Sequence, residues 1–313
     1  MDRSPRLDPA RVDALNRALM TWYERNRRDL PWRRTDDAYA IVVAEFMLQQ
    51  TGVARVAAKW PEFIVTFASW SELARATPAD VIRAWQGLGY NRRALNLWRT
   101  ARAIVDEHDG ILPRDLAALH TLPGVGPYTA AAIQAFVFGD PVPAIDVNLR
   151  RVLGRVYFGD DNATSGEVAR VGSRVVDLRA SAAWNQALMD LSATICRPRV
   201  PACERCPLPT WCVYPEASRL TSSIAPTRRA AESRGPDDTF VGSRRHLRGR
   251  VIEELRSIAN GDVMPIATLR LTLEPPLGQA RFGVDDVVAA LVSEGLIELI
   301  RRDDQVALRL AGG

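Results

Sequence analysis

One glutamate is predicted to lie among the apolar residues of a helix, a setting that suits acid catalysis. The helix is predicted over residues 38–58, and Ile41, Val42 and Leu48 share the face of Glu45. A surface glutamate would instead lie on a polar face. Loss of water raises the pKa of a carboxyl, so Glu45 is predicted to donate a proton near neutral pH. A helix-edge glutamate paired with an arginine is the alternative that the residues leave open.

A second carboxyl, that of Asp146, follows a glycine-rich hairpin. The hairpin at residues 122–126 reads LPGVG, and Pro127 suits the first position of a helix predicted over residues 128–138. The glycines allow a tight turn and a close approach to another surface. Free amides at the start of this helix would then form a phosphate-binding site.

The segment between that helix and Asp146 is long enough to bring the carboxyl back to the hairpin. The helix spans about 16 Å, and residues 139–145 reach about 23 Å when extended. Asp146 also precedes a helical run at residues 147–157 and is a good N-cap. The two roles are compatible, because a capping carboxylate is a fixed negative charge beside the hairpin.

All four cysteines lie in one short stretch, as Cys196, Cys203, Cys206 and Cys212. Four thiolates this close in sequence can hold a metal ion or an iron–sulfur cluster, and no histidine lies among them. Zinc is the first alternative, since four-cysteine zinc sites are common. Zinc ribbons usually pair two C-x2-C knuckles, however, and here only one gap has that length. A secreted disulfide scaffold would spread its cysteines more widely.

A further turn combines a flexible backbone with an aromatic ring. Residues 87–90 read GLGY, and their apolar side chain and ring could wedge between DNA bases. Ordinary loop packing is the default interpretation of such a turn. Arg92, Arg93 and Arg99 follow, and they are expected either to contact phosphates or to face water.

The composition indicates a globular protein for which nucleic-acid binding is permitted but not required. The chain has 313 residues, 47% apolar content and a net charge of +4, with a pI near 9.1. Lys59 is the only lysine, so Schiff-base chemistry near the hairpin is not expected. The N-terminus has scattered charges, and no apolar run approaches a membrane span. A soluble, cytoplasmic protein is therefore predicted.

Helices are predicted to position most of these residues. Besides those described, they occur at residues 9–28, 165–180 and 182–195, with several more within residues 61–106. An arginine-rich turn at residues 28–33 follows the first of them.

The C-terminal part of the chain has a different pattern. Residues 217–240 are rich in Ser, Pro and Arg and are predicted to be a linker. Beyond them the sequence predicts helices at residues 244–259 and 283–294, and then a hairpin of residues 296–300 and 306–310. This order looks like a winged helix. The predicted domains are residues 1–216, the linker 217–240 and residues 241–313.

Taken together, residues 9–216 resemble the MutY-type adenine DNA glycosylases of the helix-hairpin-helix-Gly-Pro-Asp superfamily. The motifs that carry the resemblance are LPWR (30–33), E-x-MLQQT (45–51), GLGY (87–90), LPGVGPYT (122–129), ID-x-N (145–148) and the four cysteines. They follow one another in the family's order and cover about two-thirds of the chain. The resemblance implies an all-α, two-lobed fold with an iron–sulfur loop, to which residues 241–313 add a small winged-helix-like α+β domain.

The resemblance also implies roles for individual residues. Glu45 matches the acid that protonates adenine N7, and Asp146 matches the carboxylate that stabilises or traps the positively charged sugar. Tyr128 and Asn148 match residues that support these two. Positions matching the adenine pocket are Arg33, Leu48 and Gln186. Positions expected to bind DNA, in part by opening the duplex and contacting the opposite 8-oxoguanine, are Gln49, Gln50, Thr51, Leu88, Gly89, Tyr90, Gly124, Val125 and Gly126. The four cysteines match the ligands of a [4Fe–4S] cluster.

The implied function is a monomeric, nucleoid-associated glycosylase that removes adenine opposite 8-oxoguanine or guanine in double-stranded DNA. Lyase-active relatives carry lysine where this chain has Tyr128, so base removal without strand cleavage is expected. Residues 241–313 are too short for the family's usual Nudix-like domain. The alternatives are a thymine or uracil mismatch glycosylase of the same superfamily and a non-catalytic lesion-binding protein.

Overall fold

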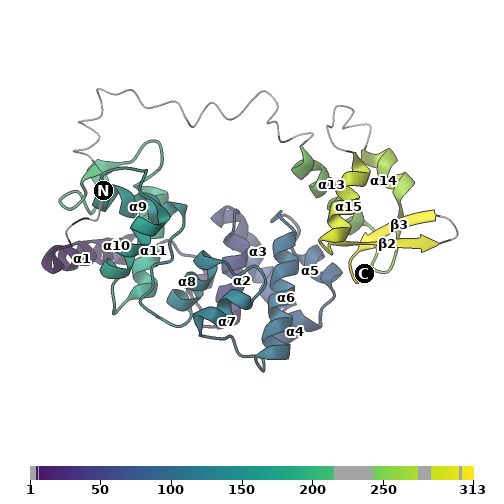
Figure 1. The fold of residues 1–313 in the computed structure, drawn as a ribbon, viewed down its shortest axis with the longest axis horizontal. Helices are drawn as coiled ribbons and strands as arrows, with labels where there is room; N and C mark the ends of the chain where they lie inside the picture. Colours follow the sequence, from purple (N-terminus) through teal and green to yellow (C-terminus); the bar gives the residue numbers. More distant parts are fainter. Residues whose placement is uncertain (1–4, 6, 215–239, 241–242, 274–282, 303–304) are drawn as a thin grey trace. The chain divides into compact units, whose positions relative to one another are not determined.

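The computed structural model describes residues 5, 7–214, 240, 243–273, 283–302 and 305–313, which belong to two compact units (Figure 1). Unit 1 consists of Met1–Glu45, Arg114–Thr121 and Val125–Thr227. Unit 2 consists of Phe46–Pro113, Leu122–Gly124 and Arg228–Gly313. Helix α2 (Ala38–Leu48) passes from the first unit into the second directly after Glu45.

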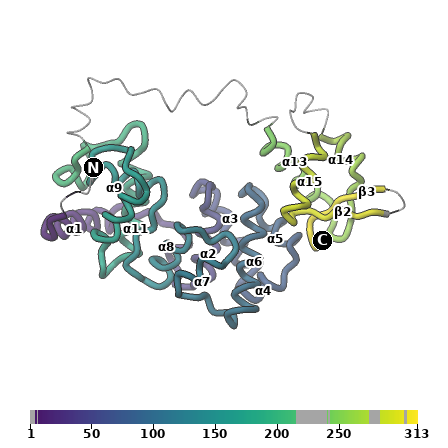
Figure 2. Tube along the Cα trace, viewed as in Figure 1, coloured from purple at the N-terminus to yellow at the C-terminus, as the bar shows by residue number. Residues whose placement is uncertain are grey.

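Unit 1 is built from helices that enclose one hydrophobic core. Its other elements are α1 (Pro9–Asn26), η1 (Pro31–Arg33), α7 (Leu116–Thr121), α8 (Pro127–Phe136), α9 (Val147–Phe158), α10 (Ser165–Val175), α11 (Ser181–Thr194) and η2 (Cys203–Arg205). Figure 2 shows α1, α9 and α11 running close together. Leu19, Leu149 and Trp184, from these three helices, are all buried in the core. The cysteine loop packs against the same core through Cys196, Cys206 and Cys212.

Unit 2 combines helices from the middle of the chain with the C-terminal segment, Arg228–Gly313. Its elements are α3 (Val53–Thr66), α4 (Trp70–Arg75), α5 (Pro78–Ala84), α6 (Arg92–Glu107), α13 (Arg244–Ser257), β1 (Met264–Pro265), α14 (Ile266–Leu273), α15 (Val284–Ser293), β2 (Ile297–Arg302) and β3 (Gln305–Leu310). One buried cluster joins Ile82 and Leu95 of the middle helices to Leu255 and Leu291 of the C-terminal segment. The C-terminal segment therefore shares a hydrophobic core with α5 and α6.

The C-terminal elements confirm the winged-helix-like prediction and add to it. The predicted helices correspond to α13 and α15, and the predicted hairpin corresponds to β2 and β3, which pair antiparallel with Leu299 opposite Leu308. The sheet has the order β1-β3-β2, and the helices lie beside it (Figure 1). The sequence did not reveal β1 or α14, because a two-residue strand and an eight-residue helix are too short to show a periodic pattern.

The prediction of one helix over residues 38–58 is wrong. The chain leaves the helix after Leu48 and starts α3 at Val53, with Gly52 as its N-cap. Gln50 has a φ of 56°, a left-handed conformation that a helix cannot contain. Gln49, Gln50 and Thr51 therefore lie in a turn between two helices, where their side chains can diverge instead of following a helical face.

Two expectations about larger segments have different outcomes. The linker at residues 217–240 lies outside the described residues, apart from Phe240. The division into domains at residues 216 and 240 stays a prediction. The compact units follow other boundaries, and one of them combines residues 46–113 with the C-terminal segment. Within the described part of the chain, no helix is both long enough and apolar enough to cross a membrane.

Candidate active site

Glu45 is buried and hydrogen-bonded to a tyrosine. Glu45 is 4% exposed. The hydroxyl of Tyr128, in the first turn of α8, donates to Glu45 Oε2 over 3.1 Å. Burial raises the pKa of Glu45 to about 7, although the Tyr128 hydrogen bond acts in the opposite direction. The predicted desolvation is confirmed. The alternative of a helix-edge glutamate paired with an arginine is wrong, because the hydrogen-bond partner is a neutral phenol.

Asp146 has the opposite surroundings. It is the N-cap of α9, and its Oδ1 accepts from the amides of Asn148 (2.9 Å) and Leu149 (2.7 Å). The Asn148 side-chain amide donates to Oδ2 over 2.7 Å. Three N–H donors at a helix N-terminus form an arrangement that stabilises negative charge. The capping role predicted from the sequence is confirmed.

The two carboxyl groups are close enough to influence one another. The charge of Asp146 raises the pKa of Glu45 further, after burial, and it also raises that of Tyr128. The connector after α8 thus brings Asp146 back toward the start of that helix, as its length predicted. Two carboxyl groups in different surroundings therefore stand together in unit 1, and cleavage of a glycosidic bond commonly uses a pair of carboxyl groups.

A chain of hydrogen bonds runs from Asp146 toward the cysteines. Asn148 Oδ1 accepts from both terminal nitrogens of Arg151 at 3.3 Å. Arg151 Nε in turn donates to the Cys196 carbonyl over 2.9 Å, and its Nη2 donates to the Ser192 carbonyl over 3.2 Å. The orientation of Asn148 therefore depends on the backbone where the cysteine loop begins. Nothing in the residue types of this segment pointed to that connection.

The four cysteines are free thiols that lie near one another. Three are half-buried and Cys203 is exposed. Burial, together with the neighbouring cysteines, raises the pKa of Cys206 to about 12 and that of Cys212 to about 11. Among the described residues, no group of three or more Cys, His, Asp or Glu side chains is already arranged to hold a metal ion.

Two of the four sulfur atoms accept hydrogen bonds from N–H groups. Arg155, which is almost fully buried, donates to Cys196 Sγ over 3.6 Å, and the Leu208 amide donates to Cys206 Sγ over 3.4 Å. Such donors oppose the effect of burial and are the kind of contact that orients and supports sulfur ligands of a metal or cluster. The donor set, four sulfur atoms and no histidine, fits an iron–sulfur cluster or zinc.

A buried ion-pair cluster fixes Arg33, one of the expected adenine-pocket residues. Its guanidinium donates to both Asp190 carboxylate oxygens, over 2.8 and 3.0 Å. Arg28 Nε donates to the same carboxylate over 2.6 Å. Burial alone would raise the pKa of Asp190, but hydrogen bonds from Arg33 and Arg28 hold it below its ordinary value. Of the other two pocket positions, Leu48 is half-buried, and Gln186 accepts from the Tyr23 hydroxyl over 2.7 Å.

Asp190, Arg28 and Tyr23 were missed by the sequence interpretation. Asp190 gave little signal, because Ala187 precedes it by three residues on α11 but Gln186 is polar and Ala193 is exposed. Glu45, by contrast, has Ile41, Val42 and Leu48 at the corresponding positions. Arg28 and Tyr23 gave no such signal, since an arginine-rich turn and an aromatic residue on an amphipathic helix both have ordinary structural explanations.

Arg93 corrects another expectation. It neither faces water nor remains available to phosphates, because it is 8% exposed and lies between two turns. Its guanidinium donates to the carbonyls of Phe46 (2.9 Å), Met47 (2.8 Å), Leu88 (3.2 Å) and Gly89 (3.2 Å) and to the Thr51 hydroxyl (2.8 Å). Arg93 thus holds the turn after α2 and the turn before α6 in a fixed relation.

The turn at residues 87–90 presents its ring and conceals its apolar side chain. Leu88 is 2% exposed, so its default interpretation as loop packing holds in this structure. Tyr90 is 44% exposed and has a φ of 46°. Gly89 has a φ of +69°, which a glycine tolerates without strain. Of the two candidate wedge residues, Tyr90 is the one on the surface.

The glycine-rich hairpin makes the close approach that its sequence predicted. Gly124 has a φ of +82°, and a Cβ there would lie 2.9 Å from Asn96 Cβ and 3.0 Å from Phe46 Cε1. Gln49 Nε2 donates to the Gly124 carbonyl over 3.5 Å. Val125 is buried, and Gly126 is the N-cap of α8 with an ordinary negative φ.

The chain is similar in sequence to known adenine DNA glycosylases and similar in structure to a thymine-DNA glycosylase. Residues 43–177 match the model of the HhH-GPD superfamily base excision DNA repair proteins. The chain is 41% identical over 244 residues to the adenine DNA glycosylase of Mycobacterium tuberculosis, which covers 76% of this chain and 77% of that protein. It is 37% identical over 286 residues to the adenine DNA glycosylase of Mycolicibacterium smegmatis, covering 90% of this chain and 91% of the relative. A thermostable thymine-DNA glycosylase is similar in structure, with a TM-score of 0.62 and 31% identity over 66% of this chain and 97% of that one.

Proposed function

The chain belongs to the MutY-type adenine DNA glycosylases of the HhH-GPD base excision repair superfamily, and on this basis we propose that it removes adenine mispaired with 8-oxoguanine or guanine. The bond broken is the N-glycosidic bond, which is hydrolysed. The observation that carries the proposal is the pairing of a buried, hydrogen-bonded Glu45 with the amide-bound Asp146 in one unit.

Glu45 is the proposed general acid. Because its pKa is about 7, a large fraction of the carboxyl is protonated at neutral pH. Tyr128 donates to one carboxyl oxygen and so leaves the proton for the other. Transfer of that proton to N7 lets adenine leave as a neutral base, and a flipped-out adenine is the substrate that can reach a buried acid.

Asp146 is the proposed anion that stabilises the sugar. Loss of the base leaves positive charge on the deoxyribose ring, and a fixed carboxylate lowers the energy of that state. The two backbone amides and the Asn148 side chain hold the carboxylate in one orientation, so it needs no reorganisation as charge develops. Asn148 is therefore proposed as a positioning residue, and Arg33 and Gln186 as adenine-pocket residues.

Strand cleavage is not part of the proposed activity. Lyase chemistry of the Schiff-base type needs a lysine amine at the sugar. Tyr128 occupies the position beside the acid, and the single lysine, Lys59, forms an ion pair with Glu62 over 2.8 Å in unit 2. Cleavage of abasic DNA by the pure protein above the heat and amine background would contradict this part of the proposal.

Cys196, Cys203, Cys206 and Cys212 are proposed to hold a [4Fe–4S] cluster. The spacing of the cysteines, the absence of histidine among them, and the N–H donors on Cys196 and Cys206 support this assignment. When bound, such a cluster would cross-link the loop and fix the carbonyl that Arg151 contacts. A brown protein with sulfide and iron would support the cluster, and a colourless protein containing zinc would contradict it.

Single-turnover excision decides the substrate. Duplexes carrying A:8-oxoG, A:G, T:G and U:G pairs are compared under identical conditions, with a fully paired duplex as the control. The proposal expects adenine to be excised from both adenine mispairs and no thymine or uracil to be released. The structural similarity to a thymine-DNA glycosylase makes thymine the competing substrate. Excision of thymine or uracil without adenine would overturn the proposal.

A further inference from the structure

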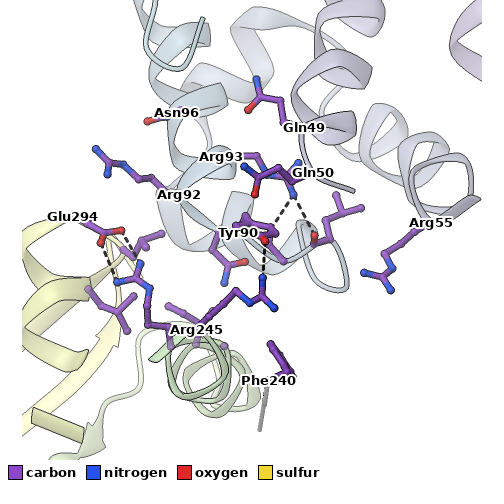
Figure 3. A pocket seen from close by; sticks show the side chains of 18 residues that line it. Gln49, Gln50, Arg55, Tyr90, Arg92, Arg93, Asn96, Phe240, Arg245 and Glu294 are labelled. Atoms are coloured by element: carbon purple, nitrogen blue, oxygen red, sulfur yellow. Dashed lines mark hydrogen bonds and ion pairs between the residues drawn. The ribbon is translucent and has the colours of Figure 1, made fainter. Parts of the chain in front are cut away.

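A pocket in unit 2, next to the turn at residues 87–90, has no part in the chemistry described above. It has a volume of about 720 Å³, within the range of small-ligand sites. Residues from the turn after α2, from the start of α6 and from the C-terminal segment line it (Figure 3). Its lining includes Gln50, Arg55, Tyr90, Arg92, Phe240 and Arg245.

The charge of the pocket is positive. Arg248 is neutralised, because it forms a two-pronged ion pair with Glu294 over 2.7 and 2.9 Å. Arg55, Arg92 and Arg245 are exposed and have no carboxylate partner among the described residues. Three such cations around one cavity favour an anion, and a DNA phosphate is the anion that the proposed function supplies.

Two aromatic rings accompany these cations. The Arg245 guanidinium lies 5.9 Å from the Tyr90 ring centroid and 5.0 Å from that of Phe240. Its Nη1 donates to the Tyr90 hydroxyl over 2.9 Å (Figure 3). Tyr90 and Phe240 are 44% and 53% exposed, although Arg93 also lies 5.6 Å from the Tyr90 ring centroid and the His246 ring lies 5.1 Å from that of Phe240. Exposed rings beside arginines are the combination that binds an unpaired nucleotide.

The backbone around the pocket is strained, and strain concentrates at functional sites. Only Gln50, Tyr90 and Asp109 combine a side chain with a positive φ among the described residues, and two of these three line the pocket. Arg93 holds both turns in place through its five hydrogen bonds. The strained turns are therefore fixed before any ligand binds.

The C-terminal segment is anchored firmly enough to present Arg245. Leu255 of α13 lies in the core that the segment shares with α5 and α6. Arg256 donates to the Ile82 carbonyl over 2.9 Å and to Asn91 Oδ1 over 2.7 Å. Arg83 donates to the Arg256 carbonyl over 2.6 Å. Helix α13 thus packs on α5 and the start of α6 through both apolar and polar contacts.

We propose that the C-terminal segment extends the DNA interface expected at Gln50 and Tyr90, with Arg245 holding a phosphate and Phe240 lying against a base at this pocket. The C-terminal segment is accordingly part of the DNA interface. This inference rests on the proposed function, because it takes DNA as the ligand. The pocket includes the turn that directly follows α2, the helix that carries Glu45.

The test measures affinity and its salt dependence. The probe is a labelled duplex with an A:8-oxoG pair whose adenosine carries a 2′-fluoro group, which destabilises positive charge on the sugar and prevents excision. Arg245→Gln is expected to bind about tenfold more weakly at low salt. The slope of log K against log salt should become shallower by about 1, the change expected for one lost phosphate contact. Arg75→Gln is the matched control, because Arg75 is exposed, lacks a described carboxylate partner and lies outside the pocket.

A second pair of variants separates the ring from the charge. Phe240→Ala is expected to weaken binding several-fold while leaving the salt slope unchanged, since stacking involves no counterion release. Arg245→Lys should keep the slope of the parent protein but lose part of the affinity, because lysine retains the charge without the planar stacking surface. Melting temperatures equal to that of the parent protein establish that the variants are folded.

The outcomes distinguish this inference from the proposed function. If the parent protein excises adenine while Arg245→Gln matches it in affinity and slope, the pocket inference is overturned and the enzyme assignment stands. If the parent protein excises no base, the proposed function fails first. Binding of the free mononucleotide dAMP that depends on Arg245, without any effect on duplex binding, would also overturn the inference, because it identifies a free-nucleotide site.

Discussion

The regions around Glu45 and Asp146 contain the same functional group in opposite surroundings. Glu45 is buried, and the described hydrogen bond to its carboxyl comes from a neutral phenol. Asp146 is half-buried at the start of a helix and accepts three N–H hydrogen bonds. Burial raises the pKa of Glu45, whereas N–H groups of the backbone and of Asn148 are directed at the Asp146 carboxyl. The proposed roles of acid and anion therefore follow from the surroundings of the two groups and not from the residue type.

The largest loss of activity is expected when Glu45 can no longer donate a proton. Glu45→Gln keeps the size of the side chain and an acceptor for the Tyr128 hydroxyl, but it cannot donate an acidic proton. Single-turnover excision of adenine is expected to fall by about 10²- to 10⁴-fold. Glu107→Gln, at an exposed helix end, is the control and should retain the parent rate. If Glu45→Gln also kept the parent rate, another group would have to protonate the base.

The next largest loss of activity is expected when the carboxylate of Asp146 is replaced by an amide. Asp146→Asn is expected to lower the excision rate by about 10²- to 10³-fold, the usual cost of losing a preorganised electrostatic contact. Asparagine is as good an N-cap as aspartate, so the melting temperature should change little. Asp8→Asn is the matched control, because Asp8 caps α1 in the same way. Full activity of Asp146→Asn would reduce Asp146 to a structural cap.

The raised pKa of Glu45 also makes the stability of the protein depend on pH. Its pKa is about 7 in the folded protein against an ordinary 4.5, so the fold binds this proton more tightly than the unfolded chain does. The stabilisation is fully present below pH 4.5 and is lost as pH rises through 7. Glu45→Gln is therefore expected to be more stable than the parent by up to about 3 kcal/mol above pH 7. Denaturant unfolding at several pH values tests this, and a stability difference that does not vary with pH would contradict it.

The smallest expected effect concerns the hydrogen bond that tunes Glu45. Excision should slow about tenfold per pH unit above pH 7, where Glu45 loses its proton. The Tyr128 hydrogen bond lowers the pKa of Glu45, so Tyr128→Phe should move this alkaline limb to higher pH. Tyr157→Phe is the control, because the buried Tyr157 hydroxyl has no hydrogen-bond partner among the described residues. A limb that stays in place, or moves to lower pH, would show that Tyr128 does not tune the acid.

Local sequence features predicted those parts of the site whose cause is local. The apolar neighbours of Glu45 at helical spacing predicted its burial, and the residues around Asp146 predicted a cap. Gly124 was predicted to allow a close approach, and a side chain there would collide with Asn96 and Phe46. In each case the deciding interactions lie within a turn or two of helix, or depend on the absence of a side chain.

Only the tertiary structure decides which residues lie against the buried face of each helix. Helical spacing does not distinguish Arg93, which is buried between two turns, from Arg92 and Arg99, which are exposed. The Arg33–Asp190 ion pair joins residues 157 positions apart, and no local pattern specifies such a pairing. Periodicity identifies the face of a helix that is buried, but the opposing surface comes from distant parts of the chain. The sequence by itself therefore determined the two carboxyls and their opposite settings, and the tertiary structure determined how they are held together.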